Sequence, residues 1–151
     1  MKRKIAAILA SIAVILGIGV LGAPAANAAG YGCSGNQIDS YPVKTNSGSQ
    51  YATIYLYYDS GTGKNCAVTV ANSAGGNGSS KEMGVFLYVC AQTSPGSTCT
   101  TQSFKQDVGN YLNYAGPVSV SAAGRCIQAN GADTWNGATA YGSSGGASHC
   151  G

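Results

Sequence analysis

The side chains best suited to nucleophilic or metal chemistry are a single histidine and six cysteines. A Ser-His-Asp or Cys-His site needs a histidine that is free to reach the nucleophile. His149 lies between Ser148 and Cys150 at the end of the chain. If Cys150 forms a disulfide, the imidazole is a surface or capping group and not a general base. We therefore predict no catalytic residue, and a small hydrolase is the least favoured function.

Other reactive sites are also disfavoured by spacing. Paired-carboxylate glycoside hydrolysis needs two acids held about 5–10 Å apart in a cleft, and the five acids of this chain stand singly on different segments. Gly61-Thr-Gly-Lys-Asn65 lacks the spacing of a phosphate-binding loop and precedes a predicted strand, not a helix. The chain has no C-x-x-C pair, which disfavours a zinc site. We expect neither a cofactor nor a metal.

The first 28 residues have the three parts of a secretory signal peptide. Residues 1–4 are basic, residues 5–21 are apolar, and Ala26-Asn27-Ala28 forms a cleavage motif of small residues. A membrane anchor is the alternative, but Pro24 and the lack of a basic flank after the apolar run argue against it. We predict cleavage before Ala29, leaving residues 29–151 as a single β-rich domain.

Removing the signal peptide also removes the apparent basicity of the chain. Three of the eight basic residues lie in residues 1–4, so 8 − 3 leaves five against five acids, a net charge of zero. The remaining charges are scattered singly and form no stripe that could neutralise phosphates. Nucleic acid and, after cleavage, the membrane are therefore not expected partners.

All six cysteines follow the signal peptide, and their even number in an exported chain indicates three disulfides. The sequence alone does not choose among the possible pairings. We prefer the pairs with short loops, which close most easily. These are Cys33–Cys66, Cys90–Cys99 and Cys126–Cys150.

Residues 51–58 and 66–71 are rich in β-branched and aromatic residues, and the glycine-rich residues 59–64 between them predict a hairpin. A two-residue turn would place Tyr57 opposite Cys66 and put the two apolar sets on opposite faces. We expect both sets on one face through an odd-length turn, which pairs Tyr58 with Cys66, Leu56 with Val68 and Ile54 with Val70.

Further short strand candidates follow the hairpin, with frequent turns between them. Residues 83–91 are apolar on both faces and predict a central strand covered on both sides. Residues 130–146 are dominated by glycine, serine and alanine, and we expect mostly loop there. Seven or eight short strands predict an all-β domain, either a β-sandwich or a small barrel stapled by disulfides.

Two features could serve binding. In the expected register, Tyr55 and Tyr57 project from the second face of the hairpin, where exposed rings would form a platform for a sugar ring or a partner protein. The alternative is that another part of the chain covers them. The loop between Cys90 and Cys99 could present a braced segment to a protease, or it could simply be the stapled end of a hairpin.

Three segments carry a family resemblance. They are Gly61-Thr-Gly-Lys-Asn-Cys-Ala-Val-Thr-Val70, Gly109-Asn-Tyr-Leu-Asn-Tyr-Ala-Gly-Pro-Val-Ser-Val-Ser-Ala-Ala-Gly-Arg-Cys126 and His149-Cys-Gly151. With most of residues 33–151, they resemble the small secreted actinomycete proteins of the spore-associated protein A family. This chain departs from the family pattern in carrying Cys90 and Cys99. It also has Ile127-Gln-Ala-Asn130 where the family tends to have an aromatic near an acid.

The resemblance implies a secreted protein that adheres to spores or the outer cell surface without enzymatic activity. We therefore expect an extracellular or surface-associated, non-enzymatic domain. Its partners would be the spore or cell-envelope surface, a polysaccharide or another protein. The alternative function is a secreted polysaccharide-binding module or a protease inhibitor.

Overall fold

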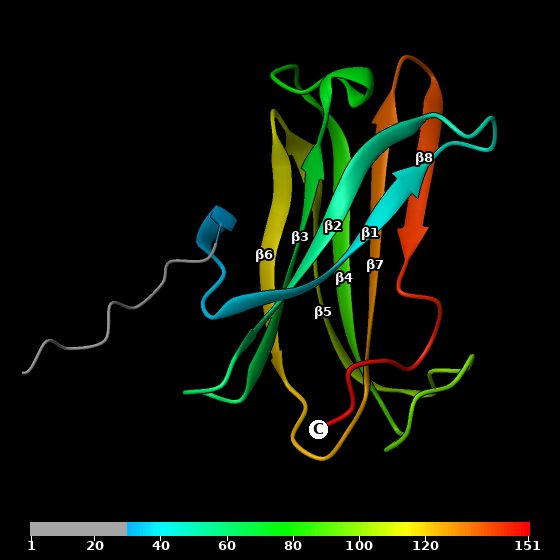
Figure 1. The fold of residues 1–151 in the computed structure, drawn as a ribbon. Helices are drawn as coiled ribbons and strands as arrows, with labels where there is room; N and C mark the ends of the chain where they lie inside the picture. Colours follow the sequence, from blue (N-terminus) through cyan, green and yellow to red (C-terminus); the bar gives the residue numbers. More distant parts are fainter. Residues whose placement is uncertain (1–29) are drawn as a thin grey trace, which may run out of the picture.

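The computed structural model describes residues 30–151, so the predicted signal peptide lies outside the described residues. Eight antiparallel strands form one sheet that curls into a nearly closed barrel (Figure 1). The strands are β1 (Asn36–Lys44), β2 (Gln50–Asp59), β3 (Lys64–Ala71), β4 (Lys81–Cys90), β5 (Thr101–Tyr111), β6 (Tyr114–Ser121), β7 (Ile127–Trp135) and β8 (Ala138–Ser143). The predicted all-β fold is confirmed, and of its two forms the chain adopts the barrel.

Two short 3-10 turns, η1 (Gly30–Gly32) and η2 (Ser73–Gly75), complete the described secondary structure. Among residues 30–151, no helical segment has the length and apolarity that a membrane-spanning helix requires.

The strand order is β5-β4-β7-β8-β1-β2-β3-β6, so β5 and β6 are the two ends of the sheet. These two strands are neighbours in the chain, which brings the ends of the sheet together. Asp107 on β5 accepts a hydrogen bond from the Gly116 N–H of β6 at 2.7 Å. A side chain thus joins the ends of the sheet where a backbone ladder is missing, and the barrel stops just short of full closure.

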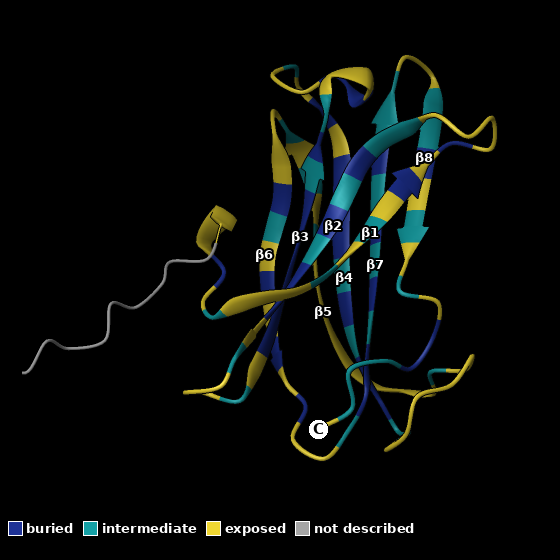
Figure 2. Ribbon diagram, in the orientation of Figure 1, coloured by how far each residue is buried: buried dark blue, intermediate teal, exposed yellow. Residues whose placement is uncertain are grey.

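The core fills the barrel interior because alternate residues of each strand point inward. Met83, Val85 and Leu87 of β4 are buried on this face, with Ile54 and Leu56 of β2 against them. Figure 2 shows the buried positions along the strands in dark blue. Burying a large aliphatic side chain contributes about 1.5–3 kcal/mol relative to leaving it exposed, so this face holds the barrel together.

The predicted register of the β2–β3 hairpin is wrong by one residue. Tyr57, and not Tyr58, lies opposite Cys66, and Leu56 lies opposite Ala67. Asp59 pairs with Lys64, which leaves an even loop of residues 60–63. The two apolar sets therefore lie on opposite faces. Both faces are covered, one by the barrel core and the other by the N-terminal segment, so no single apolar face determined the register.

The expectation of loop over residues 130–146 is also wrong, because most of this stretch forms β7 and β8. Trp135 pairs with Ala138, so the connection is the two-residue turn Asn136-Gly137. Both turn residues have positive φ, 49° and 76°. This is the turn chemistry that Asn-Gly favours in a tight hairpin.

The positive φ of the turn predicts that alanine destabilises the protein more at Gly137 than at Gly96, although both positions have room for a side chain. A Cβ at Gly137 or at Gly96 would meet nothing within 4 Å, but only Gly137 has a positive φ, +76°. Gly137→Ala is expected to lower the free energy of unfolding by about 1 kcal/mol through backbone strain alone. Gly96→Ala, the matched control, should cost little. Urea unfolding of both variants checks this, and equal losses would contradict it.

Candidate groove on the outer sheet

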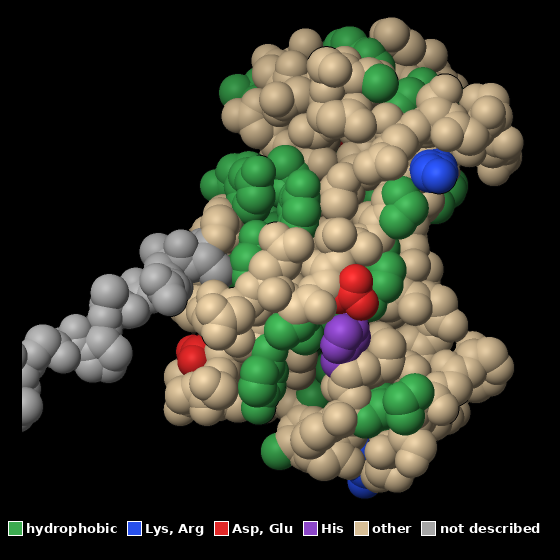
Figure 3. Space-filling model, in the orientation of Figure 1, with side chains coloured by type: hydrophobic (Ala, Val, Ile, Leu, Met, Phe, Trp, Pro, Cys, Tyr) green, Lys and Arg blue, Asp and Glu red, His purple; other side chains and the backbone are tan. Residues whose placement is uncertain are grey.

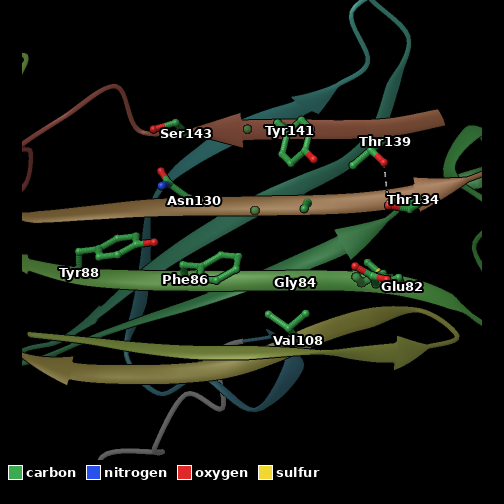
Figure 4. Close-up of a pocket in the computed structure, with 14 residues that line it drawn as sticks. Glu82, Gly84, Phe86, Tyr88, Val108, Asn130, Thr134, Thr139, Tyr141 and Ser143 are labelled. Carbon is green, nitrogen blue, oxygen red and sulfur yellow. Dashed lines mark hydrogen bonds between the residues drawn. The ribbon is translucent and has the colours of Figure 1, made fainter.

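The outward face of β5, β4, β7 and β8 is hollowed into a groove with a volume of about 600 Å³ (Figure 4). Since Met83 and Val85 of β4 point into the core, their neighbours Glu82, Gly84 and Phe86 point outward. The same alternation turns the even-numbered residues of β7 outward. The groove therefore consists of side chains from four strands that the barrel core holds in place.

The floor of the groove is made by residues with almost no side chain. Gly84 of β4 pairs with Val108 of β5 on one side and with Ala132 of β7 on the other. Ala132 in turn pairs with Tyr141 of β8. A Cβ added at Gly84 would lie 3.2 Å from both the Phe86 ring and a Val108 methyl. The Phe86 ring and the Val108 methyl thus lie close over Gly84, which is buried, and Ala132 is the partly exposed residue of the floor.

One bank of the groove carries aromatic rings. Phe86 and Tyr88 of β4 are stacked, with ring centroids 6.4 Å apart and an interplanar angle of 10°. Phe104 of β5, which lies outside the groove lining, packs on Tyr88 at 5.7 Å and is 51% exposed. Phe86 and Tyr88 are half-buried, and such mutually supported rings offer an apolar surface at little cost in conformational freedom.

Most of the other side chains that line the groove are polar, and hydrogen bonds connect several of them. The Gln128 amide nitrogen donates to Asn130 Oδ1 and to Ser143 Oγ, both at 3.3 Å. On the opposite bank, the hydroxyls of Thr134 and Thr139 lie 3.1 Å apart, as the dashed line in Figure 4 marks. These contacts orient donors and acceptors toward the groove before any ligand arrives.

Sequence reasoning missed this groove, since more than half of its lining residues come from the stretch expected to be loop. Asn130, Thr134, Thr139, Tyr141 and Ser143 all lie on β7 and β8. The dipeptide Asn136-Gly137 between two alternating stretches is the sequence pattern that would have found the hairpin.

The predicted binding residues Tyr55 and Tyr57 do not form an open platform. Tyr57 is 4% exposed and packs with Cys33 and Cys66. Tyr31 stacks on Tyr55 with centroids 6.0 Å apart. The segment that covers these rings is held by the disulfide between Cys33 and Cys66, which is the alternative considered from the sequence.

The six cysteines form the preferred pairs Cys33–Cys66, Cys90–Cys99 and Cys126–Cys150. The loop between Cys90 and Cys99 exposes residues 93–98. Its Gly96 N–H donates to the Ala147 carbonyl at 3.0 Å. The loop is thus tied to the C-terminal segment and is not free along its whole length.

His149 is held in a polar cluster on the surface beside β1. Its Nε2 lies 3.0 Å from the Tyr41 hydroxyl and 3.2 Å from Asp39 Oδ2, and Tyr41 also donates to Asp39. Figure 3 shows the histidine with an acidic side chain directly against it. One ring nitrogen therefore meets both partners, whereas in a catalytic triad one nitrogen orients the ring and the other serves the nucleophile.

The same cluster shifts the titration of its members. Partial burial raises the pKa of Asp39, but hydrogen bonds from Tyr41, the Ser40 N–H and His149 outweigh it, so the pKa is lowered from its usual value. Burial and the bond to Asp39 raise the pKa of Tyr41. Asp39 is thus held as the anion, and the cluster ties the C-terminal residues to β1.

Comparisons with known proteins identify a relative. The chain is 34% identical over 155 residues to Spore-associated protein A of Streptomyces coelicolor, and the match covers 89% of this chain and 87% of that protein. No family model and no solved structure matches. On the extent of that identity, the chain belongs to the spore-associated protein A family.

Proposed function

We propose that this protein is a secreted, non-enzymatic domain that adheres to the spore or outer cell surface by binding polysaccharide in the groove of β5, β4, β7 and β8. The name of the relative supports association with spores. Three disulfides support an oxidising, extracellular location. The groove is the observation that carries the binding function.

The groove fits a sugar because a sugar ring is itself amphipathic. Each face of a pyranose presents C–H groups, and its rim presents hydroxyls. The rings of Phe86 and Tyr88 suit the faces, while Asn130, Thr134 and Thr139 suit the rim. Ligand sites commonly combine an apolar surface with a few placed polar groups in this way.

The small number of acids in the groove favours binding over hydrolysis. Glycoside hydrolysis ordinarily employs two carboxyl groups on either side of the bond that breaks. Of the described residues that line the groove, Glu82 is the only acid. One carboxylate can accept hydrogen bonds from a sugar, which supports binding.

The proposal is tested by a pull-down on purified spores, chitin and peptidoglycan with wild type and single variants. Phe86→Ala is expected to lower retention about tenfold on the surface that binds wild type, since losing a stacked ring costs about 1.5 kcal/mol. Tyr55→Ala is the matched control, because Tyr55 lies outside the groove.

Two results would overturn the proposal. Failure of every surface to retain wild type would remove the adhesive function. Loss of retention with Tyr55→Ala but not with Phe86→Ala would move the binding surface to the β2–β3 hairpin.

A further inference from the structure

We infer that the groove takes an uncharged glycan chain lying across the strands, along the line from Val108 through Gly84 and Ala132 to Tyr141. This inference rests on the proposed polysaccharide-binding function and adds the direction, length and charge of the ligand.

The direction follows from the position of the floor. Gly84 and Ala132 are cross-strand neighbours, so the lowest part of the groove runs perpendicular to the strands. Val108 and Tyr141 continue the same row on the flanking strands. Adjacent strands lie about 4.8 Å apart, so four strands give a row about 14 Å long. One ring of an extended glycan advances by about one strand spacing, and the row therefore accommodates about three rings.

The width follows from the residues on either side of this row. Phe86 and Asn130 are paired across β4 and β7 and form one bank, two residues along the strands from the floor. Glu82 of β4 and Thr134 of β7 lie two residues from the floor in the opposite direction and form the other bank. Four residues of extended strand measure about 13 Å between Cα atoms. The side chains of the two banks occupy part of this distance, and the space left between them is about as wide as one sugar ring.

The polar groups of the banks are already ordered. Asn130 Oδ1 accepts a hydrogen bond from Gln128, which leaves the Asn130 amide nitrogen as the donor that can serve the ligand. The paired hydroxyls of Thr134 and Thr139 can each donate or accept. Groups fixed in advance lose less conformational entropy on binding, which favours recognition of a ring's hydroxyls.

The charge of the ligand follows from Glu82. Of the described residues in the lining, Glu82 is the only one with a charge at neutral pH. Its two carboxylate oxygens can accept bonds from two adjacent sugar hydroxyls. The same carboxylate repels uronic acids and phosphates. Lys44 pairs with Tyr141 at the end of the row but does not line the groove, so it does not reverse this preference.

The test is calorimetric titration of the purified protein with three soluble probes. Two are uncharged, cello-oligosaccharides and N-acetylglucosamine oligomers of one to six rings, and the third is anionic oligogalacturonate. We expect affinity for at least one uncharged series to rise up to about three rings and then level off. Oligogalacturonate should bind at least about tenfold more weakly than that series.

Two variants separate the effect of the groove floor from the effect of the Glu82 charge. Ala132→Leu fills the floor and should abolish binding, whereas Ala123→Leu, at an exposed alanine outside the groove, should leave it unchanged. Glu82→Gln, at an exposed side chain, keeps the test valid if Ala132→Leu fails to fold. It should weaken the uncharged probe and remove the discrimination against oligogalacturonate.

The outcomes distinguish this inference from the proposed function. If spores, chitin and peptidoglycan retain wild type through Phe86 but oligogalacturonate binds best, the function stands and the inferred ligand is wrong. Binding that levels off at one ring, or that survives in a folded Ala132→Leu variant, also overturns the inference. If no surface retains the protein, the proposed function itself fails.

Discussion

Replacing Asp133 with Asn is expected to raise the free energy of unfolding at pH 8 by up to about 3 kcal/mol. Asp133 on β7 is fully buried, and no described residue offers a hydrogen bond to either carboxylate oxygen. Burial raises the pKa of Asp133 from 3.8 to about 6, and the charge of Lys81 only partly offsets this. Since one pKa unit corresponds to about 1.4 kcal/mol, the buried anion costs about 3 kcal/mol.

The sign of the pH dependence follows from the direction of this shift. The folded protein holds the Asp133 proton more tightly than the unfolded chain does. Its contribution to stability is therefore full below pH 4 and is lost as the pH rises from about 4 through about 6. The Asn variant, which cannot ionise, lacks this loss. Wild type and variant should thus differ little near pH 4 and most above pH 6.

Urea unfolding at pH 4 and pH 8 with the disulfides intact measures both effects. Asp107→Asn is the matched control. The Asp107 carboxylate accepts hydrogen bonds from the Tyr111 hydroxyl and the Gly116 N–H, so this variant should lose stability at both pH values. A wild-type stability that does not fall between pH 4 and pH 8, or an Asp133→Asn variant less stable at pH 8, would contradict the prediction.

A comparison with Lys81 shows why the buried charge of Asp133 is unfavourable. The two side chains enter the same end of the barrel, and burial lowers the pKa of Lys81. Its ammonium, however, donates to the carbonyls of Gly76, Ser79 and Leu112 at 2.9–3.2 Å. A buried charge with three partners is stabilised, whereas one without partners is not.

Removing the Cys33–Cys66 disulfide by paired alanine substitutions is expected to lower the free energy of unfolding by about 4 kcal/mol. The bridge spans 33 residues of sequence, and opening a loop of this length restores that much chain entropy to the unfolded state. It also releases the segment that covers Tyr57, whose ring is 4% exposed. Chemical iodination of Tyr57 should therefore become faster, a local effect that the loss of chain entropy alone does not produce.

The Cys90–Cys99 bridge provides the comparison for this experiment. It spans nine residues, so its removal should cost about 2.5 kcal/mol on the same chain-entropy argument. It should leave the iodination of Tyr57 unchanged. Equal losses of stability from the two removals, or faster iodination in both, would show that the N-terminal segment is not held as described.

The sequence predicted strands well where large apolar residues mark them, and poorly where small residues do. Ile54 and Leu56 revealed β2, and the apolar residues of both faces revealed β4 as an inner strand. The expected cover on both sides of β4 was wrong, because Phe86 and Tyr88 on its outer face line the groove and are only partly buried. On β7, however, the inward-facing residues Ala129 and Gly131 are small because the interior is crowded there. A Cβ at Gly131 would lie 2.5 Å from Thr69 Oγ1. Small residues imposed by close packing resemble a loop when they are read along the chain.

By itself, the sequence determined the fold class and favoured three disulfides, an exported context and membership of the spore-associated protein A family. These conclusions follow from residue types, their spacing and sequence similarity, none of which requires a structure. The tertiary structure decided the hairpin register and the position of the groove. Both depend on what covers each face of a strand: the N-terminal segment covers Tyr55 and Tyr57, while the outer face of the sheet stays partly exposed at Ala132 of β7. Segments distant in the chain determine which face of a strand stays uncovered, so the local residue pattern cannot predict it.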